Sequence, residues 1–411
     1  LVGRGPRRCR IDALDVIVVA FLALSTIYLL IPSIVGASAS SFDLRSRALG
    51  WRSSVLYVVA FLALRHLRLG REVVDRILRR VLIAIVVTAV IGIFEAIFSS
   101  TWNHLAVNDL GVTNYRHVVL GQQPGGLFHL NDIRSFGTLN GHEILRIGSV
   151  LFDYVSIGFV FAIGLGIAAE LTARAQGRPW AYACMPILGA ALLLTQTRSA
   201  LVAAVVAVAF ALRRRAGKPL AQRAHFGRVL AVVLLLLVPV TLATGALNRF
   251  AGDTANNTIH QSRARAALSI MVEQPLGRGL GTTGGGVSAA DQSPSSTGPT
   301  VIATESQYLL VGTQLGWAGA VLYAAITMLA AAKLMSRRGD DATALAPGAM
   351  SNVAVGVALG AVFTQPFVTI EVAFLFWGLL GLAVSVADDG AGDPATDVAA
   401  PGELVAVGEH A

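Results

Sequence analysis

The residues best suited to chemistry lie in a long polar stretch from Asn248 to Leu315. It contains Arg263 and Arg265, a glycine-rich run (277–286) and the sequence Thr304-Glu305-Ser306 ahead of an apolar segment. The planar fork of arginine suits phosphate oxygens, and a carboxylate such as Glu305 can accept a proton from a reacting hydroxyl. Two passive interpretations stay open: the arginines contact lipid phosphates, or Glu305 complements a helix dipole. The glycine-rich run lacks the lysine-serine ending of a P-loop, so we exclude nucleotide binding.

A further arginine interrupts an apolar run, in the sequence Leu194-Thr195-Gln196-Thr197-Arg198-Ser199-Ala200. An arginine at the centre of a membrane helix costs about 2.5–3.5 kcal/mol. The sequence therefore predicts a tight outer turn between two spans, with Arg198 at membrane-surface depth. An arginine held there suits a phosphate, and the alternative is that it snorkels to lipid headgroups.

Membrane helices must position these residues. The chain has 411 residues, of which 55% are hydrophobic and 14% charged, and its mean hydropathy is +0.66. Soluble domains have about 25% charged residues, whereas a bilayer span needs about 20 apolar residues. We predict an all-α polytopic transmembrane helix bundle with a large outer loop that contains short helices. About ten spans are expected, at 13–34, 53–68, 79–98, 149–171, 180–196, 198–212, 229–247, 306–332, 351–367 and 370–387.

The basic residues orient these spans. Of the 32 Lys and Arg residues, 21 fall in segments on the side of the N-terminus, so the positive-inside rule predicts that both termini are cytoplasmic. The outer loops are then about 99–148 and 248–305. Residues 1–387 form the membrane domain, and 388–411 are an acidic, disordered cytoplasmic tail. The net charge of +8 is spread over short loops, which excludes nucleic acid as a partner.

The histidines and cysteines do not predict a metal site. The first outer loop contains His104, His117, His129 and His142 without a zinc-type spacing, and Cys9 and Cys184 are isolated. We expect no metal and no cofactor.

Several of these features together resemble the superfamily of O-antigen ligases and O-antigen polymerases, over roughly residues 79–390. They are the run Arg134-Ser135-Phe136-Gly137, the turn Thr195-Gln196-Thr197-Arg198, Arg263 ahead of Glu273-Gln274-Pro275-Leu276-Gly277-Arg278-Gly279-Leu280-Gly281, and the helix from Glu305-Ser306-Gln307-Tyr308 to Gln314-Leu315-Gly316-Trp317-Ala318-Gly319. The ligase branch usually has a histidine where this chain has Thr304-Glu305-Ser306. That departure favours a polymerase-like or divergent activity.

The resemblance implies a glycosyltransferase of the cytoplasmic membrane, active in envelope or exopolysaccharide synthesis. Its partners would be a polyprenyl-diphosphate-linked oligosaccharide, an acceptor glycan or lipid, and membrane lipids. The outer arginines would hold the carrier diphosphate in a metal-independent, inverting transfer, which assigns that role to Arg134, Arg198, Arg263 and Arg265. Glu305 is the first candidate for the proton acceptor and Glu143 the second.

Two other classes of protein remain open. A polytopic transporter would also combine apolar spans with polar interruptions, although we find no inverted repeat and few charges near the middle of a span. A non-catalytic component of an envelope assembly system is the other alternative.

Overall fold

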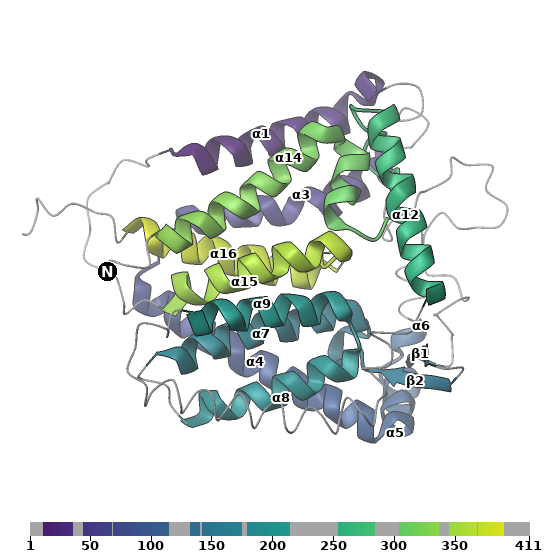
Figure 1. Cartoon of the computed structure of the whole chain (residues 1–411), viewed down its shortest axis with the longest axis vertical. Helices are drawn as coiled ribbons and strands as arrows, with labels where there is room; N and C mark the ends of the chain where they lie inside the picture. The colour runs from purple at the N-terminus through teal and green to yellow at the C-terminus, as the bar shows by residue number, and fades with distance from the viewer. Residues whose placement is uncertain are drawn as a thin grey trace, which may run out of the picture.

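The computed structural model is a bundle of long helices that lie side by side, with shorter elements gathered at one end (Figure 1). It describes residues 11–35, 44–67, 69–114, 132–139, 142–174, 179–213, 254–283, 304–336, 345–367 and 369–389. The end that carries α12 and the two strands is called the loop end below. The opposite end, where Arg65 lies, is called the Arg65 end.

The long helices of the described residues are α1 (Ala13–Leu30), α3 (Leu44–His66), α4 (Arg71–Ile97), α7 (Tyr154–Ala173), α8 (Pro179–Thr195), α9 (Arg198–Arg213), α14 (Gln307–Ser336), α15 (Leu345–Phe363) and α16 (Ile370–Asp389). The loop end adds α5 (Ser99–His104), a π-helical turn (Leu105–Asp109), α6 (Val112–Asn114) and α12 (Thr254–Glu273). It also has one antiparallel hairpin, β1 (Ser135–Leu139) with β2 (His142–Arg146), which the sequence did not predict. Two 3-10 turns complete the described elements, Pro32–Val35 and Ser149–Leu151.

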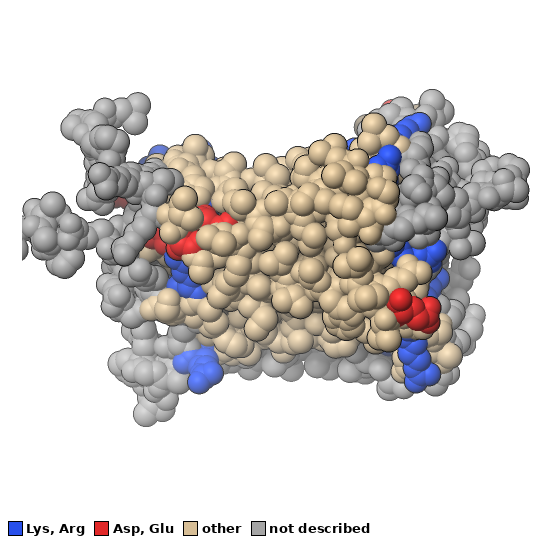
Figure 2. All heavy atoms as spheres, turned by 90° about the horizontal axis from the view of Figure 1, so that it is seen from above, with Lys and Arg blue, Asp and Glu red and all other residues tan. Residues whose placement is uncertain are grey.

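Seven of the described helices, α1, α3, α4, α7, α14, α15 and α16, are long and apolar enough to cross a membrane, and α8 is apolar but shorter. The prediction of a polytopic helical membrane protein is thus confirmed, whereas the number of about ten spans is not. The predicted span 229–247 lies outside the described residues. Figure 2 shows a broad band on one face in which neither acidic nor basic residues are seen, with charged residues toward both ends. Such a band is what contact with lipid requires.

Three predicted spans differ clearly from the structure. The spans expected at 53–68 and 79–98 are longer, because α3 begins at Leu44 and α4 at Arg71. The span expected at 306–332 is interrupted, because Gly316 in α14 has φ 71° and ψ −171°. Only glycine adopts this conformation readily. The part of α14 after Gly316, residues 317–336, is long enough at about 1.5 Å per residue to cross a bilayer core of about 30 Å. The part before it is a separate short helix at the loop end.

Close helix packing fixes the frame beneath the loop end. Nearly every residue of α7 is buried, and α15 packs tightly on α9. A Cβ atom added to Gly356 of α15 would lie 2.2 Å from the carbonyl oxygen of Ala203 in α9. Small residues allow such approaches between membrane helices. The end of α15 and the start of α9, both at the loop end, are therefore held in one rigid unit.

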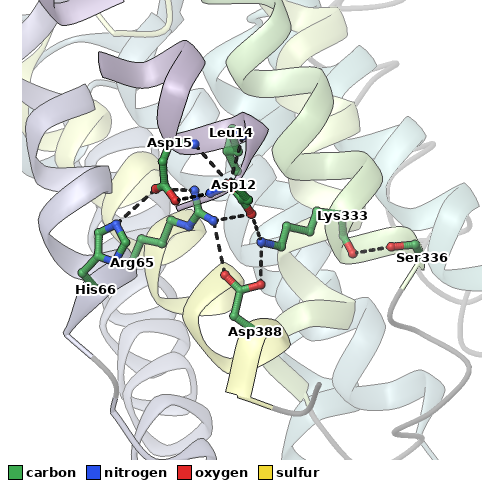
Figure 3. Close-up of polar contacts among 8 residues, drawn as sticks. All are labelled: Asp12, Leu14, Asp15, Arg65, His66, Lys333, Ser336 and Asp388. Atoms are coloured by element: carbon green, nitrogen blue, oxygen red, sulfur yellow. Dashed lines mark hydrogen bonds and ion pairs between the residues drawn. The ribbon is translucent and has the colours of Figure 1, made fainter. Parts of the chain in front are cut away.

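At the Arg65 end, ionisable side chains from four helices or their ends meet around a buried arginine (Figure 3). The side chain of Arg65 is 2% exposed and donates to Asp15 Oδ1 at 2.7 Å, Asp12 Oδ2 at 2.6 Å and Asp388 Oδ2 at 3.3 Å. We call this group the Arg65 cluster; its members are Asp12, Asp15, Arg65, His66, Lys333 and Asp388.

The Arg65 cluster ties the start of α1 to the ends of α3, α14 and α16. Asp12 also caps α1, because its side chain accepts from the amides of Leu14 and Asp15. Burial would raise the pKa of Asp12, but hydrogen bonds from Arg65 and Lys333 outweigh it and hold that pKa below its usual range. Asp12 therefore stays ionised at neutral pH and keeps the four helix ends together.

Candidate functional site

The carboxylate of Glu305 lies at the loop end, where α12 passes the start of α14. Its Oε1 accepts a hydrogen bond from Nη1 of Arg263, and its Oε2 is 3.4 Å from Nδ1 of His260. His260 and Arg263 are three residues apart on α12, so they share one helix face. The structure thus brings together Glu305 and Arg263, which the sequence singled out separately. It adds His260, for which that spacing from Arg263 was the available signal.

The end of α15 fixes the segment that carries Glu305. Gln365 donates its side-chain amide to Thr304, with Nε2 2.7 Å from Oγ1. Ser306 donates its hydroxyl to the carbonyl of Ala361 at 3.3 Å, and the amide of Gln307 donates to the carbonyl of Thr364 at 3.1 Å. These hydrogen bonds fix the position of the backbone on both sides of Glu305.

The described part of the glycine-rich run supports α14 at its break. In a continuous helix the carbonyls of Thr313 and Gln314 would accept from residues four positions later. Here they accept instead from the amides of Arg278 at 2.8 Å and Gly279 at 3.0 Å. In return, the amide of Trp317 donates to the carbonyl of Pro275 at 3.1 Å. The Pro-Leu-Gly-x-Gly pattern is thus explained by backbone pairing with α14.

Replacing Gly316 by alanine should destabilise the protein strongly. The added Cβ would lie 2.3 Å from the carbonyl oxygen of Pro275, and the backbone conformation alone costs about 1–3 kcal/mol for other residues. Thermal unfolding in detergent measures the effect. The control is Gly70→Ala, where no atom lies within 4 Å of the added Cβ. Equal melting temperatures for the two variants would contradict the conclusion that the backbone conformation at position 316 requires glycine.

The turn between α8 and α9 is held by the end of the hairpin. Gln196 has a φ of 53°, and its side-chain amide donates to the carbonyl of Leu145 at 3.2 Å. Arg146 donates from Nε to the carbonyl of Thr195 at 3.1 Å, and its guanidinium lies 3.3 Å from the ring centre of Tyr154. The predicted turn is confirmed, since α8 ends at Thr195 and α9 begins at Arg198. Sequence reasoning missed Arg146, whose only signal was its place just ahead of an apolar run.

The end of α15 also joins this turn to the Glu305 segment. A Cβ atom added to Gly360 would lie 2.9 Å from the carbonyl oxygen of Ser199, and the next residue, Ala361, accepts from Ser306. Ser199 follows Arg198, and Ser306 follows Glu305. The end of α15 therefore contacts both the residue after Arg198 and the residue after Glu305.

Residues 183–324 match the family model described as O-Antigen ligase. This match confirms that the segment resembles the superfamily of O-antigen ligases and O-antigen polymerases. The matched segment begins within α8 and ends within α14, so it includes the turn, α12 and the segment around Glu305. No curated protein matches the chain.

Four of the residues predicted for the site lie inside the matched segment: Arg198, Arg263, Arg265 and Glu305. Arg198 is the first residue of α9 and half-buried, and Arg265 is exposed on α12. Within the described residues, no group of three or more His, Cys, Asp or Glu side chains is arranged to hold a metal ion.

The other two predicted residues lie in the hairpin region, outside the match to the O-antigen ligase model. Arg134 forms a two-pronged contact with Asp132, with Nε 2.9 Å from Oδ1 and Nη2 2.7 Å from Oδ2. The hydrogen bonds to Asp132 raise the pKa of Arg134. A phosphate would have to displace that carboxylate, so Arg134 is less available to one in this arrangement. Glu143 lies on β2 opposite Thr138, and its side chain is outside the described residues.

Proposed function

We propose that the protein is a membrane glycosyltransferase that transfers or polymerises glycan from a polyprenyl-diphosphate carrier, in cell-envelope or exopolysaccharide synthesis. The acceptor is a second glycan or a lipid. The superfamily supports transfer of a glycosyl group within a multi-pass membrane protein. The carrier, the acceptor and the roles of individual residues are our proposal.

The observation that carries the proposal is that the end of α15 contacts the residue after Arg198 and the residue after Glu305, which itself binds Arg263. A cation at the first residue of a helix is not explained by helix stability, because the N-terminal end of the helix dipole is itself positive. Together with the helix amides, Arg198 makes a site suited to an anion. Arg263 brings a second cation beside Glu305, and Arg265 is a third on the exposed face of α12.

The proposed reaction is a single displacement. The acceptor hydroxyl attacks the anomeric carbon of the carrier-bound sugar as the bond from that carbon to the diphosphate oxygen breaks. The electron pair of the broken bond leaves with the diphosphate, where the arginines stabilise the growing negative charge. The acceptor proton passes to a group in the Glu305 region. Glu143, the second candidate, would act from β2.

We place the loop end on the outer face of the cytoplasmic membrane, with both termini inside. The excess of Lys and Arg in the predicted segments on the side of the N-terminus supports this orientation. It puts the arginines of the site where a carrier with an outward-facing sugar can reach them.

Carrier-lipid analysis in a deletion strain tests the proposal. Cells that lack the protein should accumulate diphosphate-linked oligosaccharide that impermeant periodate can oxidise from outside, and the intact gene should reverse the accumulation. If the lipid pool is unchanged, the enzyme proposal fails, and a transporter of another solute or a non-catalytic assembly component is favoured.

A further inference from the structure

The position of His260 against Glu305 extends the proposed function. Glu305 divides its two oxygens between two residues of α12, with Oε1 bound by Arg263 and Oε2 3.4 Å from Nδ1 of His260. Nδ1 is buried and has no hydrogen-bond partner among the described residues, although the side chain as a whole is 43% exposed. The exposed area therefore belongs to the rest of the ring, whose far edge carries Nε2.

This arrangement gives the two groups different roles. The Glu305 carboxylate already forms a charged hydrogen bond with the guanidinium of Arg263. A histidine ring takes up and releases protons near neutral pH, and a carboxylate beside one nitrogen holds the proton there. With the proton on Nδ1 facing Glu305, the lone pair of Nε2 faces the solvent side. A group in that state can accept a proton from an incoming hydroxyl.

We propose that His260 accepts the acceptor proton and that Glu305, held by Arg263, positions it. The inference rests on the proposed transfer reaction. As the acceptor oxygen bonds to the anomeric carbon, its proton moves to Nε2 and the ring becomes a cation. The electron pair of the broken bond leaves with the diphosphate. The cation is balanced by Glu305, and its proton returns to solvent after the products leave.

The 3.4 Å separation is longer than an ordinary hydrogen bond. Catalytic hydrogen bonds are often long before substrate binds and shorten in the complex. The side chains of His260 and Arg263 are 43% and 45% exposed, so the ring of His260 has room to adjust toward Glu305.

The experiment measures glycan transfer from a polyprenyl-diphosphate-linked oligosaccharide in membranes, at matched protein levels and across pH. His260→Gln should lower the rate by about 10²–10⁴-fold and remove the fall in rate on the acid side of the pH profile. The matched control is His104→Gln, another loop-end histidine near a carboxylate, with Nδ1 3.7 Å from Asp109 Oδ2. It should keep the wild-type rate and profile.

A second variant separates chemistry from packing. His260→Ala leaves an opening at an exposed position, and added imidazole should restore a measurable part of the rate, with a pH dependence set by imidazole. The inference is overturned if His260→Gln keeps a third or more of the wild-type rate. It is equally overturned if the rate falls while the pH profile is unchanged and imidazole restores nothing. Absence of transfer by wild-type membranes would instead overturn the proposed function.

Discussion

Arg198→Lys should lower glycan transfer by about 10²–10³-fold, the usual effect of removing one well-placed group that stabilises transition-state charge. Lysine keeps the positive charge but loses the planar fork that binds two phosphate oxygens at once. The turn cannot easily move to compensate, because Arg146, Gln196 and the end of α15 hold it. The rate of transfer in membranes, with expression matched by immunoblot, measures the effect.

The matched control is Arg213→Lys, the same change at the opposite, exposed end of α9. It should leave transfer unchanged. A near-normal rate for Arg198→Lys would contradict the proposal that Arg198 binds the diphosphate. Contact with lipid headgroups would then be the remaining interpretation of this residue. The same substitution at Arg263 should also lower the rate, both through the lost fork and through the changed contact with Glu305.

Arg65→Leu should destabilise the bundle by about 3–5 kcal/mol, the cost of breaking a buried ion pair by removing one partner. Asp15 is 5% exposed and depends on Arg65 and His66 for its ion pairs. Without Arg65 the three carboxylates of the cluster keep one full cation, Lys333. Thermal unfolding in detergent, or the fraction of protein that elutes as a folded peak, measures the loss.

Two further variants test the electrostatic cause. Arg52→Leu changes an exposed arginine of the same helix and should be nearly neutral. The double variant Arg65→Leu with Asp15→Leu should recover much of the stability, because replacing both partners of a buried pair by apolar residues is often tolerated. If the double variant is less stable than Arg65→Leu, burial of an unpaired charge is not the cause.

Hydropathy predicted the membrane helices because a bilayer core forces each crossing segment to satisfy its own backbone, and a helix does this locally. It placed the start of α3 too late, because Arg45, Arg47 and Arg52 were read as a loop. They instead extend the helix at the loop end, and Arg47 donates to the carbonyl of Leu29 at 2.8 Å. Charged side chains on the terminal turns of a membrane helix can reach the interface. The presence of charged residues therefore does not mark the end of the helix.

The site was less predictable because its geometry depends on contacts between distant segments. The types of residue pointed to Arg198, Arg263 and Glu305, but no local pattern shows that Glu305 is bound by Arg263 or that the end of α15 contacts the residues next to Glu305 and Arg198. His260 and Arg146 acquire their roles only through partners 45 and about 50 residues away in the chain. The break at Gly316 was hidden for a related reason. Glycine is common in membrane helices, and the loop that compensates for the break comes from elsewhere in the sequence.

The Arg65 cluster also shows that the chain enters and leaves the bundle at the same end. Asp12 stands just before α1 and Asp388 near the end of α16, and both bind Arg65, so the two limits of the bundle share one end. A path that returns to its starting side makes an even number of crossings, whereas the described residues contain nine long helices, an odd number. Arg213 closes α9 at the Arg65 end and Thr254 opens α12 at the loop end (Figure 1). The predicted span 229–247 falls between these two residues and lies outside the described residues.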